Sequence, residues 1–137
     1  MTLNYTKPLP TPTPQTQPYW DAAKQHELRI QRCKSCGKFR HYPQPMCPHC
    51  YSFDVEWAKV SGKGKIYTWL IANRAFHPGF ASEVPYATVV VELEEGVRMI
   101  SQMVDTKAEE LEIGMPVEVV FVDVTPEITL PMFKRAG

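Results

Sequence analysis

Four cysteines stand in two close pairs, and their spacing is typical of a metal site. Cys33 and Cys36 form the first pair and Cys47 and Cys50 the second, which gives the pattern C-x2-C-x10-C-x2-C. Two residues between paired cysteines let both sulfur atoms reach one ion, and four thiolates suit tetrahedral Zn²⁺. Iron takes the same ligands in rubredoxin-like sites, so the spacing favours Zn²⁺ without excluding iron. The sequence predicts one metal ion on these four cysteines.

The predicted metal is structural, because four protein ligands leave no open coordination position for water or substrate. All four cysteines are assigned to it, so none remains as a nucleophile, and neither His41 nor His49 is expected to be a ligand. The other histidines, His26 and His77, belong to no Ser/His/Asp arrangement, and the chain has no phosphate-binding loop or dinucleotide fingerprint. The residues alone therefore indicate a metal-stabilised binding module with no catalytic residues of its own.

Length and composition exclude several classes of protein. The chain has 137 residues, enough for one domain with a core but too few for a thiolase, a TIM barrel or a two-domain dehydrogenase. No apolar run reaches the ~18 residues of a membrane span, and the first residues lack the apolar segment of a signal peptide. Cysteine pairs without secretory context indicate a reducing compartment. We expect a cytoplasmic protein that does not associate with membranes.

Charge is divided unevenly along a chain whose net charge is zero. Residues 1–50 carry seven basic and two acidic side chains, whereas residues 51–137 carry eight basic and thirteen acidic ones. The basic front part either meets phosphates or an acidic partner, or is simply a solvated surface. The balance over the whole chain argues against a general nucleic-acid binder, because such binders need a positive surface.

The N-terminal part predicts an extended arm followed by one short helix. Five prolines fall within residues 6–18, and proline favours an extended polyproline-like conformation. A helix is expected over residues 18–27 with Thr16 as its cap, because apolar residues, Tyr19 and Trp20 among them, recur at three- and four-residue spacings. This aromatic stripe docks either on the body of the protein or on a partner.

Alternating and β-branched residues predict strands in the rest of the chain. The expected strands cover residues 28–32, 55–60, 65–71, 86–93, 97–104, 116–124 and 128–133. One helical turn is expected at residues 108–111, and a loop with turn residues at 76–85. This order, without βαβ periodicity, favours a small antiparallel oligonucleotide/oligosaccharide-binding (OB) barrel over a sandwich.

Several short motifs give the chain a resemblance to a known family. Besides the two cysteine pairs they are Tyr19-Trp20, Tyr42-Pro43, Ser61-Gly62-x-Gly64-x-Ile66-Tyr67-Thr68, Pro85-Tyr86, Val91-Glu92-Leu93, Gly96-Val97-Arg98, Ile113-Gly114-Met115-Pro116-Val117 and Leu130-Pro131-x-Phe133. With them the chain resembles the zinc-ribbon/OB-fold family of acyl-CoA-associated proteins, long catalogued as a domain of unknown function. The expected fold is mostly β. A Pro-rich arm and N-terminal helix occupy residues 1–27, a rubredoxin-like zinc ribbon residues 28–54, and a small antiparallel OB-fold β-barrel with a C-terminal tail residues 55–137.

The resemblance also implies a function. Members of the family are small partners of thiolase-fold enzymes, in acyl-CoA thiolases, steroid side-chain aldolases, the archaeal hydroxymethylglutaryl-CoA synthase system and an acetylphloroglucinol-forming acyltransferase. The thiolase-fold subunit supplies the catalytic cysteine and histidine. The chain is therefore expected to be a non-catalytic zinc-binding subunit of a hetero-oligomer acting on a CoA thioester, supporting assembly and acyl-CoA access.

Two other functions compete with this expectation. An OB barrel also binds single-stranded nucleic acid on aromatic platforms, for which Tyr67, Trp69 and Phe76 are the candidates, but the acidic barrel half opposes phosphate binding. A stand-alone CoA-thioester hydrolase or acyltransferase is the third possibility, and the missing nucleophile argues against it.

One loop is the first candidate for contact with a partner or with acyl-CoA. It joins two predicted strands, is longer than a tight hairpin needs, and holds Arg74, Phe76, His77 and Phe80. The two phenylalanines either fold back on the barrel or insert into the partner, since burying each is worth ~1.5–3 kcal/mol. Arg74 is expected to pair with a phosphate, a carboxylate or Glu83. Together with the arm, the helix bearing Trp20 is a second candidate.

Overall fold

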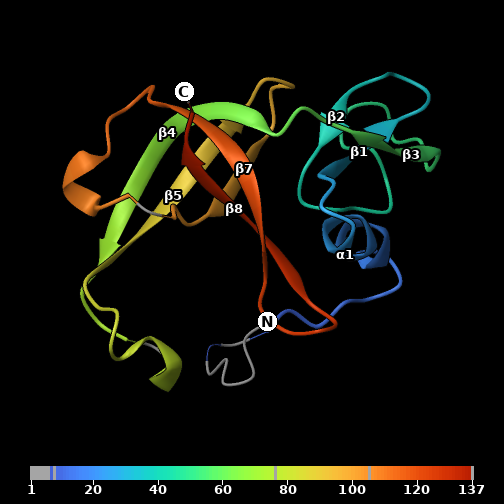
Figure 1. Cartoon of the computed structure of the whole chain (residues 1–137). Coiled ribbons are helices and arrows are strands. Elements are labelled where there is room, and N and C mark those ends of the chain that lie inside the picture. Colours follow the sequence, from blue (N-terminus) through green and yellow to red (C-terminus); the bar gives the residue numbers. More distant parts are fainter. Residues whose placement is uncertain (1–6, 8, 76, 105, 137) are drawn as a thin grey trace.

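The computed structural model describes residue 7 and residues 9–75, 77–104 and 106–136. Within these residues the chain is mostly β, with one α-helix, a small three-stranded sheet and a five-stranded sheet that curls on itself (Figure 1). The cysteines belong to the small sheet and its loops. The predicted fold class is confirmed: an N-terminal helix and a zinc ribbon are followed by an antiparallel sheet curled as in an OB barrel.

The elements follow the predicted order along the chain. They are α1 (Gln17–Lys24), β1 (Arg29–Cys33), β2 (Phe39–Arg40), β3 (Val55–Lys59), β4 (Lys63–Ala72), η1 (Pro78–Phe80), β5 (Tyr86–Leu93), β6 (Arg98–Ser101), η2 (Ala108–Glu110), β7 (Pro116–Asp123) and β8 (Thr129–Arg135), where η marks a 3-10 helix. The bounds of β5 agree with the prediction, and the other predicted elements differ by a few residues at one or both ends. The sequence did not predict β2, because two residues are too few to show an alternating pattern.

Helix α1 is shorter than the sequence predicted. It begins with Pro18 in its first turn, where proline fits because that N–H would be unpaired anyway. Thr16 occupies the N-cap position, but its side chain makes no capping hydrogen bond. The helix ends at Lys24 because His26 adopts a left-handed conformation with φ of 62°. The N–H groups of His26 and Glu27 then bond back to helix carbonyls, which closes the last turn.

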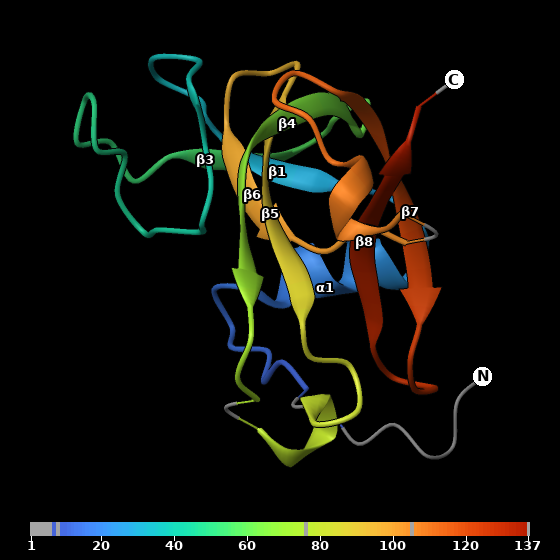
Figure 2. The same ribbon diagram turned by 90° about the vertical axis from the view of Figure 1, so that its left-hand side faces the viewer.

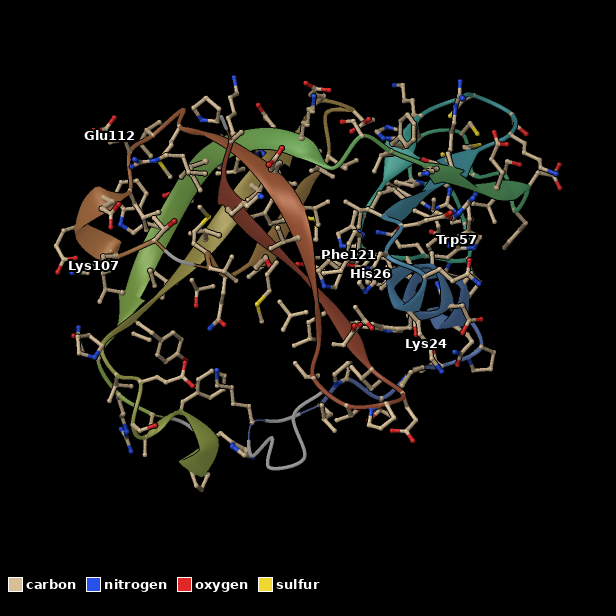
Figure 3. All side chains as sticks on the ribbon, in the orientation of Figure 1. Lys24, His26, Trp57, Lys107, Glu112 and Phe121 are labelled. Carbon is tan, nitrogen blue, oxygen red and sulfur yellow. The ribbon has the colours of Figure 1, made fainter. Side chains whose placement is uncertain are left out.

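His26 also ties the end of the helix to the barrel. Its ring stacks on Phe121 with the centroids 5.3 Å apart, as Figure 3 shows for these two labelled side chains. Its Nε2 lies 3.1 Å from a carboxylate oxygen of Asp123. Since both partners belong to β7, the helix is fixed against one side of the barrel.

The ribbon sheet has the strand order β2-β1-β3 and is antiparallel throughout. A buried polar cluster holds the loop that follows β2. Gln31 accepts hydrogen bonds from Nε of Arg40 at 2.9 Å and from the backbone N–H of Gln44 at 2.8 Å, and Arg40 donates to the carbonyl of Gln44 at 2.8 Å. Because Gln31 and Arg40 are only 3% and 5% exposed, these bonds fix the loop that carries His41 and Tyr42.

The barrel sheet has the strand order β6-β5-β4-β7-β8, with antiparallel neighbours. Strand β4 bends through a register shift between Ile66 and Thr68, so it pairs with β5 along most of its length and with β7 only at its start. Such a bulge strengthens the local twist and lets one strand belong to two parts of a curled sheet.

The barrel is closed at one end only, where the outer strands β6 and β8 meet. Met103, just after β6, forms a parallel bridge with Phe133, and Val104 donates its N–H to the Phe133 carbonyl at 2.8 Å. Strand β6 ends earlier than predicted, at Ser101, because the chain turns here toward β8. Nearer the ribbon the two strands are linked by a side chain instead, since the Ser101 hydroxyl donates to the Pro131 carbonyl at 2.9 Å. The sheet therefore has an opening between β6 and β8.

One hydrophobic core joins the ribbon side and the barrel. Its members come from the helix, from the first ribbon strand and from every barrel strand; those with the smallest exposure are Ile30, Ile66, Val89, Val91, Val117 and Phe133. Figure 2 shows α1 and β1 lying behind β8, in agreement with this shared core. Among the described residues, no helix is long and apolar enough to cross a membrane.

Candidate metal centre and a cavity at the barrel opening

The four predicted cysteines come together at one end of the ribbon. Their sulfur atoms all lie within 4.8 Å of one another. The sulfurs of Cys33 and Cys50 are 3.5 Å apart, and those of Cys36 and Cys47 are 3.7 Å apart. A tetrahedral Zn²⁺ with bonds of ~2.3 Å would place its sulfur ligands about 3.8 Å apart. The arrangement therefore fits one four-coordinate metal ion.

Each cysteine pair sits in a tight turn of the same form. Gly37 donates its N–H to the Cys33 carbonyl, and Tyr51 donates its N–H to the Cys47 carbonyl, each at 2.9 Å. Both donors have a left-handed backbone, with φ of 78° for Gly37 and 65° for Tyr51. Glycine adopts this conformation readily, as at Gly37, whereas Tyr51 is an uncommon case because tyrosine rarely does.

The local backbone favours thiolates at the two buried cysteines. The N–H of Cys36, 3.4 Å from the Cys33 sulfur, is the main cause that lowers the pKa of Cys33 to about 6. The N–H of Cys50 likewise lowers the pKa of Cys47. Although the N–H of Ser52 favours a Cys50 thiolate, the neighbouring sulfurs raise the pKa of Cys50 to about 12.

This donor set suits a structural metal. Four thiolates at such short distances repel one another, and a divalent cation would neutralise them while joining the two turns. Within the described residues, the metal-binding group contains only the four cysteines, so neither His41 nor His49 belongs to it. Four protein donors fill a tetrahedral site, which suits a stabilising ion rather than a catalytic one.

The loop between β4 and β5 is held partly by the protein itself (Figure 2). Phe80 stacks on Tyr86 with the ring centroids 5.0 Å apart, and the ammonium of Lys7 lies 5.3 Å from the Phe80 centroid. The His77 Nδ1 accepts the N–H of Gly79 at 3.0 Å and so caps η1. Of the other loop candidates, Arg74 is exposed and Phe76 lies outside the described residues.

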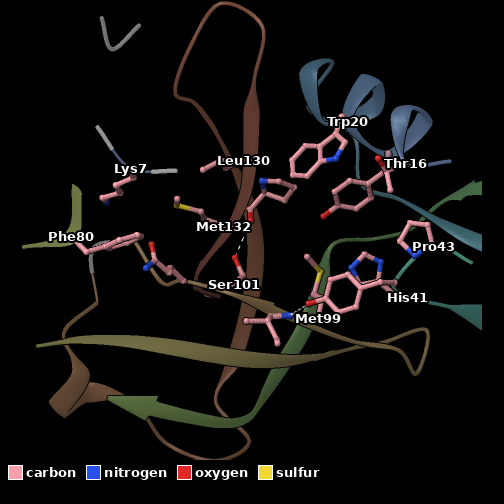
Figure 4. A pocket seen from close by; sticks show the side chains of 15 residues that line it. Lys7, Thr16, Trp20, His41, Pro43, Phe80, Met99, Ser101, Leu130 and Met132 are labelled. Carbon is pink, nitrogen blue, oxygen red and sulfur yellow. Dashed lines mark hydrogen bonds between the residues drawn. The ribbon is translucent and has the colours of Figure 1, made fainter. Parts of the chain in front are cut away.

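Two of the five predicted contact residues, Trp20 and Phe80, meet at one cavity although they are far apart in the sequence. The cavity has a volume of about 340 Å³ and lies between α1, the loop after β2, and strands β6 and β8 (Figure 4). It occupies the opening left where the barrel is not closed. Neither Arg74 nor His77 lines it.

His41 and Tyr42 are among the residues of this cavity that sequence reasoning missed. Both lie on its wall, and the Tyr42 hydroxyl accepts the N–H of Ile100 in β6 at 2.9 Å. The ring of His41 lies 4.1 Å from that of Tyr42 and 5.4 Å from that of Tyr19, measured between centroids. The one sequence signal for these residues was the Tyr42-Pro43 motif. It does not show that Tyr42 contacts Ile100, which lies far away along the chain.

Large apolar side chains are also exposed outside the cavity. On the ribbon, Tyr51 and Phe53 are 69% and 71% exposed. On the barrel, Leu70 of β4 is 59% exposed. Exposed large apolar side chains mark a candidate contact surface where they form a contiguous patch.

Comparison with known families agrees with both parts of the fold. A family model described as "ChsH2, rubredoxin-like zinc ribbon domain" matches residues 20–56. A second, described as "ChsH2, C-terminal OB-fold domain", matches residues 57–122.

Individual proteins give the same result. A solved structure described as the Ltp2-ChsH2(DUF35) aldolase contains a chain with 40% sequence identity and a TM-score of 0.85, over 94% of this chain and all of that one. A probable enoyl-CoA hydratase alpha subunit from Thermomonospora curvata is 43% identical over 118 residues, or 86% of this chain, which spans 36% of that protein's length. The benzoylsuccinyl-CoA thiolase subunit BbsA from Geobacter metallireducens is 33% identical over 76 residues, which are 56% of this chain and 49% of that one. The chain therefore belongs to the ChsH2/DUF35 family of zinc-ribbon and OB-fold proteins.

Proposed function

We propose that this protein is a zinc-binding, non-catalytic subunit of a cytoplasmic complex in which a thiolase-fold enzyme acts on a CoA thioester by thiolase, retro-aldol or acyl-transfer chemistry. The observation that carries the proposal is the match, over nearly the whole chain, to a chain from an aldolase assembly. The names of two further relatives, a hydratase subunit and a thiolase subunit, support acyl-CoA chemistry in a multi-subunit enzyme.

The role of the metal follows from its position. Zn²⁺ on Cys33, Cys36, Cys47 and Cys50 holds the two turns of the ribbon together and takes no part in the reaction. The ribbon then presents Tyr51 and Phe53, two of the most exposed large apolar residues, to the partner. The loop with Phe80 and the side of α1 with Trp20 flank the cavity and offer a second contact for partner or acyl-CoA.

The nucleic-acid alternative loses support from the placement of the aromatic residues. The guanidinium of Arg98 lies 3.8 Å from the centre of the Tyr67 ring and covers one of its faces. Trp69 is partly buried and packs against the core. A stacking platform needs open ring faces, which these two residues do not offer together.

The experiment is co-expression of the tagged chain with the thiolase-fold protein encoded nearest to its gene. We expect the two to co-purify, and we expect CoA-thioester turnover from the complex but none from this chain alone. Replacing exposed Tyr51 and Phe53 with serine is expected to abolish co-purification while metal content and melting temperature stay unchanged. Robust turnover by the isolated chain, or no association with any thiolase-fold protein, would overturn the proposal.

A second pair of variants tests the loop. Phe80→Ser removes an apolar contact on the cavity side of the loop, and Ile113→Ser, at an exposed position before β7 and outside the cavity, serves as its control. If the loop binds the partner, only the Phe80 variant weakens co-purification. If the Phe80 variant instead lowers the melting temperature and retains the partner, the ring belongs to the core of the chain, as its stacking on Tyr86 allows.

A further inference from the structure

The cavity at the barrel opening has the size and the walls of a small-molecule site. Its volume of about 340 Å³ is within the range of roughly 300–1,000 Å³ that is usual for ligand pockets. Most of its wall is apolar or aromatic, with Trp20, Met99, Ile100, Pro131 and Met132 among its residues (Figure 4). Beside it, β6 and β8 are linked through the Ser101 hydroxyl and the Pro131 carbonyl instead of a backbone ladder, so the space lies where the sheet is open.

Two polar atoms in the wall lack partners among the described residues. Tyr19 is 8% exposed and lines the cavity, yet its hydroxyl makes no hydrogen bond with any described residue. His41 lines the same cavity, and its Nδ1 is buried with no hydrogen-bond partner in the described chain. The Ser101 hydroxyl already donates to the Pro131 carbonyl, and the Tyr42 hydroxyl already accepts the N–H of Ile100. The Nδ1 atom of His41 is closed off from the cavity space, so the Tyr19 hydroxyl, on the wall, is the atom that marks where a ligand atom would bind.

The hydroxyl of Tyr19 is a donor at every physiological pH. Burial, with a smaller contribution from the nearby Tyr42, raises the pKa of Tyr19 well above its usual value. Among the described wall residues, no charge is left without a partner. Burial lowers the pKa of His41 to about 4, so its ring is neutral near pH 7, and the Lys7 ammonium at the wall is paired with Glu83. A mostly apolar space whose ammonium is paired, with the Tyr19 hydroxyl as a donor on its wall, suits a neutral molecule that brings an acceptor oxygen.

We infer that this cavity binds an uncharged apolar molecule through its carbonyl oxygen, which accepts a hydrogen bond from Tyr19 while the apolar body fills the opening between β6 and β8. This inference does not depend on the proposed function, because the site lies within this chain alone. It assigns the helix, the ribbon loop and the barrel a common task, since each contributes one wall.

The test uses two probes of nearly equal shape, 2-acetylnaphthalene and 2-ethylnaphthalene, and the zinc-loaded full chain. Only the first carries a carbonyl oxygen. Binding is followed by two-dimensional NMR, and we expect both probes to shift the amide signals of Ile100 and Met132. In Tyr19→Phe we expect affinity for the ketone to fall about threefold to tenfold and affinity for the hydrocarbon to stay the same, because only the hydroxyl is lost.

Two further variants serve as a control and as a block of the cavity. Tyr67→Phe removes a hydroxyl from an exposed tyrosine of β4 that does not line the cavity, so it should change neither affinity. Met132→Trp fills the opening from β8 and should abolish binding of both probes, with zinc content and melting temperature confirming the fold. The inference is overturned if neither probe shifts cavity signals up to its solubility limit, or if Tyr19→Phe binds the ketone as well as the unchanged chain does.

Discussion

The phenolic oxygen of Tyr42 lies 2.9 Å from the backbone nitrogen of Ile100 and accepts its hydrogen bond. Tyr42 belongs to the ribbon, and Ile100 belongs to β6, an outer strand of the barrel sheet. An outer strand presents unpaired N–H groups that would otherwise face solvent or another chain. One side chain thus joins the two parts of the molecule and protects the edge of the opening.

This contact predicts the effect of removing one oxygen atom. Tyr42→Phe should lower the free energy of unfolding by about 1 kcal/mol, because the Ile100 N–H loses its acceptor while the ring remains. Denaturant unfolding measures the change, and amide exchange at Ile100 should become faster. Tyr51→Phe is the matched control and should change stability by less than ~0.5 kcal/mol, since that tyrosine is 69% exposed. Equal effects of the two variants would show that the bond does not stabilise the fold.

Metal analysis of the purified chain should find one Zn²⁺ per molecule. Cys47→Ser should release the metal and unfold the ribbon, because metal binding and folding are coupled when the ligands come from two separate turns. Ser35→Ala is the control in the same sheet region, since its hydroxyl only donates to Ser52 at 2.9 Å. Folded protein without any metal would contradict the prediction, whereas iron would change the identity of the ion and leave its structural role intact.

Two glycines with left-handed backbones should differ in their tolerance of a side chain. At Gly62, φ is 77° and a Cβ would lie 2.3 Å from Cγ1 of Val119, whereas at Gly96, φ is 92° and a Cβ would have no neighbour within 4 Å. Gly96→Ala should cost ~1–2 kcal/mol for the backbone conformation alone. Gly62→Ala should cost ~1–3 kcal/mol more, because Val119 must also move. Similar melting temperatures for the two variants would show that the contact at Val119 relaxes freely.

Stability should fall on acidification partly because of His41. Burial lowers the pKa of His41 to about 4 in the folded chain, below its usual value near 6.5. Between these two values the unfolded chain binds a proton that the folded chain does not, so stability decreases as the pH falls through this range, by up to ~1.4 kcal/mol per pH unit. In His41→Gln, the free energy of unfolding should depend less steeply on pH, because one fewer group binds a proton on unfolding.

The measurement is denaturant unfolding of both proteins at pH 7.0, 6.0 and 5.0, with zinc content determined at each pH. The difference between the two proteins isolates His41 from other groups with lowered pKa values, such as Cys33 and Asp123. Parallel pH profiles for the two proteins would contradict the prediction.

The sequence by itself determined those features of the fold and the site that depend on residues close together along the chain. The spacing of Cys33, Cys36, Cys47 and Cys50 predicted one cluster, because two residues between ligands restrict each pair to a tight turn. Alternating and β-branched residues predicted most of the strands, since the pattern of side chains along a strand repeats every two residues. The ends of helices and strands were predicted less well than their existence. Helix α1, for example, ends at Lys24 because His26 takes a left-handed conformation that few histidines adopt.

Only the tertiary structure decided how distant segments meet. The cavity joins Trp20, Tyr42 and Phe80 because β6 and β8 stay apart beside the ribbon. The residue pattern of a single strand predicts that strand but does not show which distant strand it pairs with. The loop with Arg74 and His77 was predicted as a single contact site, yet only Phe80 of its described candidates reaches the cavity. Burial of Tyr19 and His41 depends on the same packing, because desolvation is set by what lies across the space and not by neighbours along the chain.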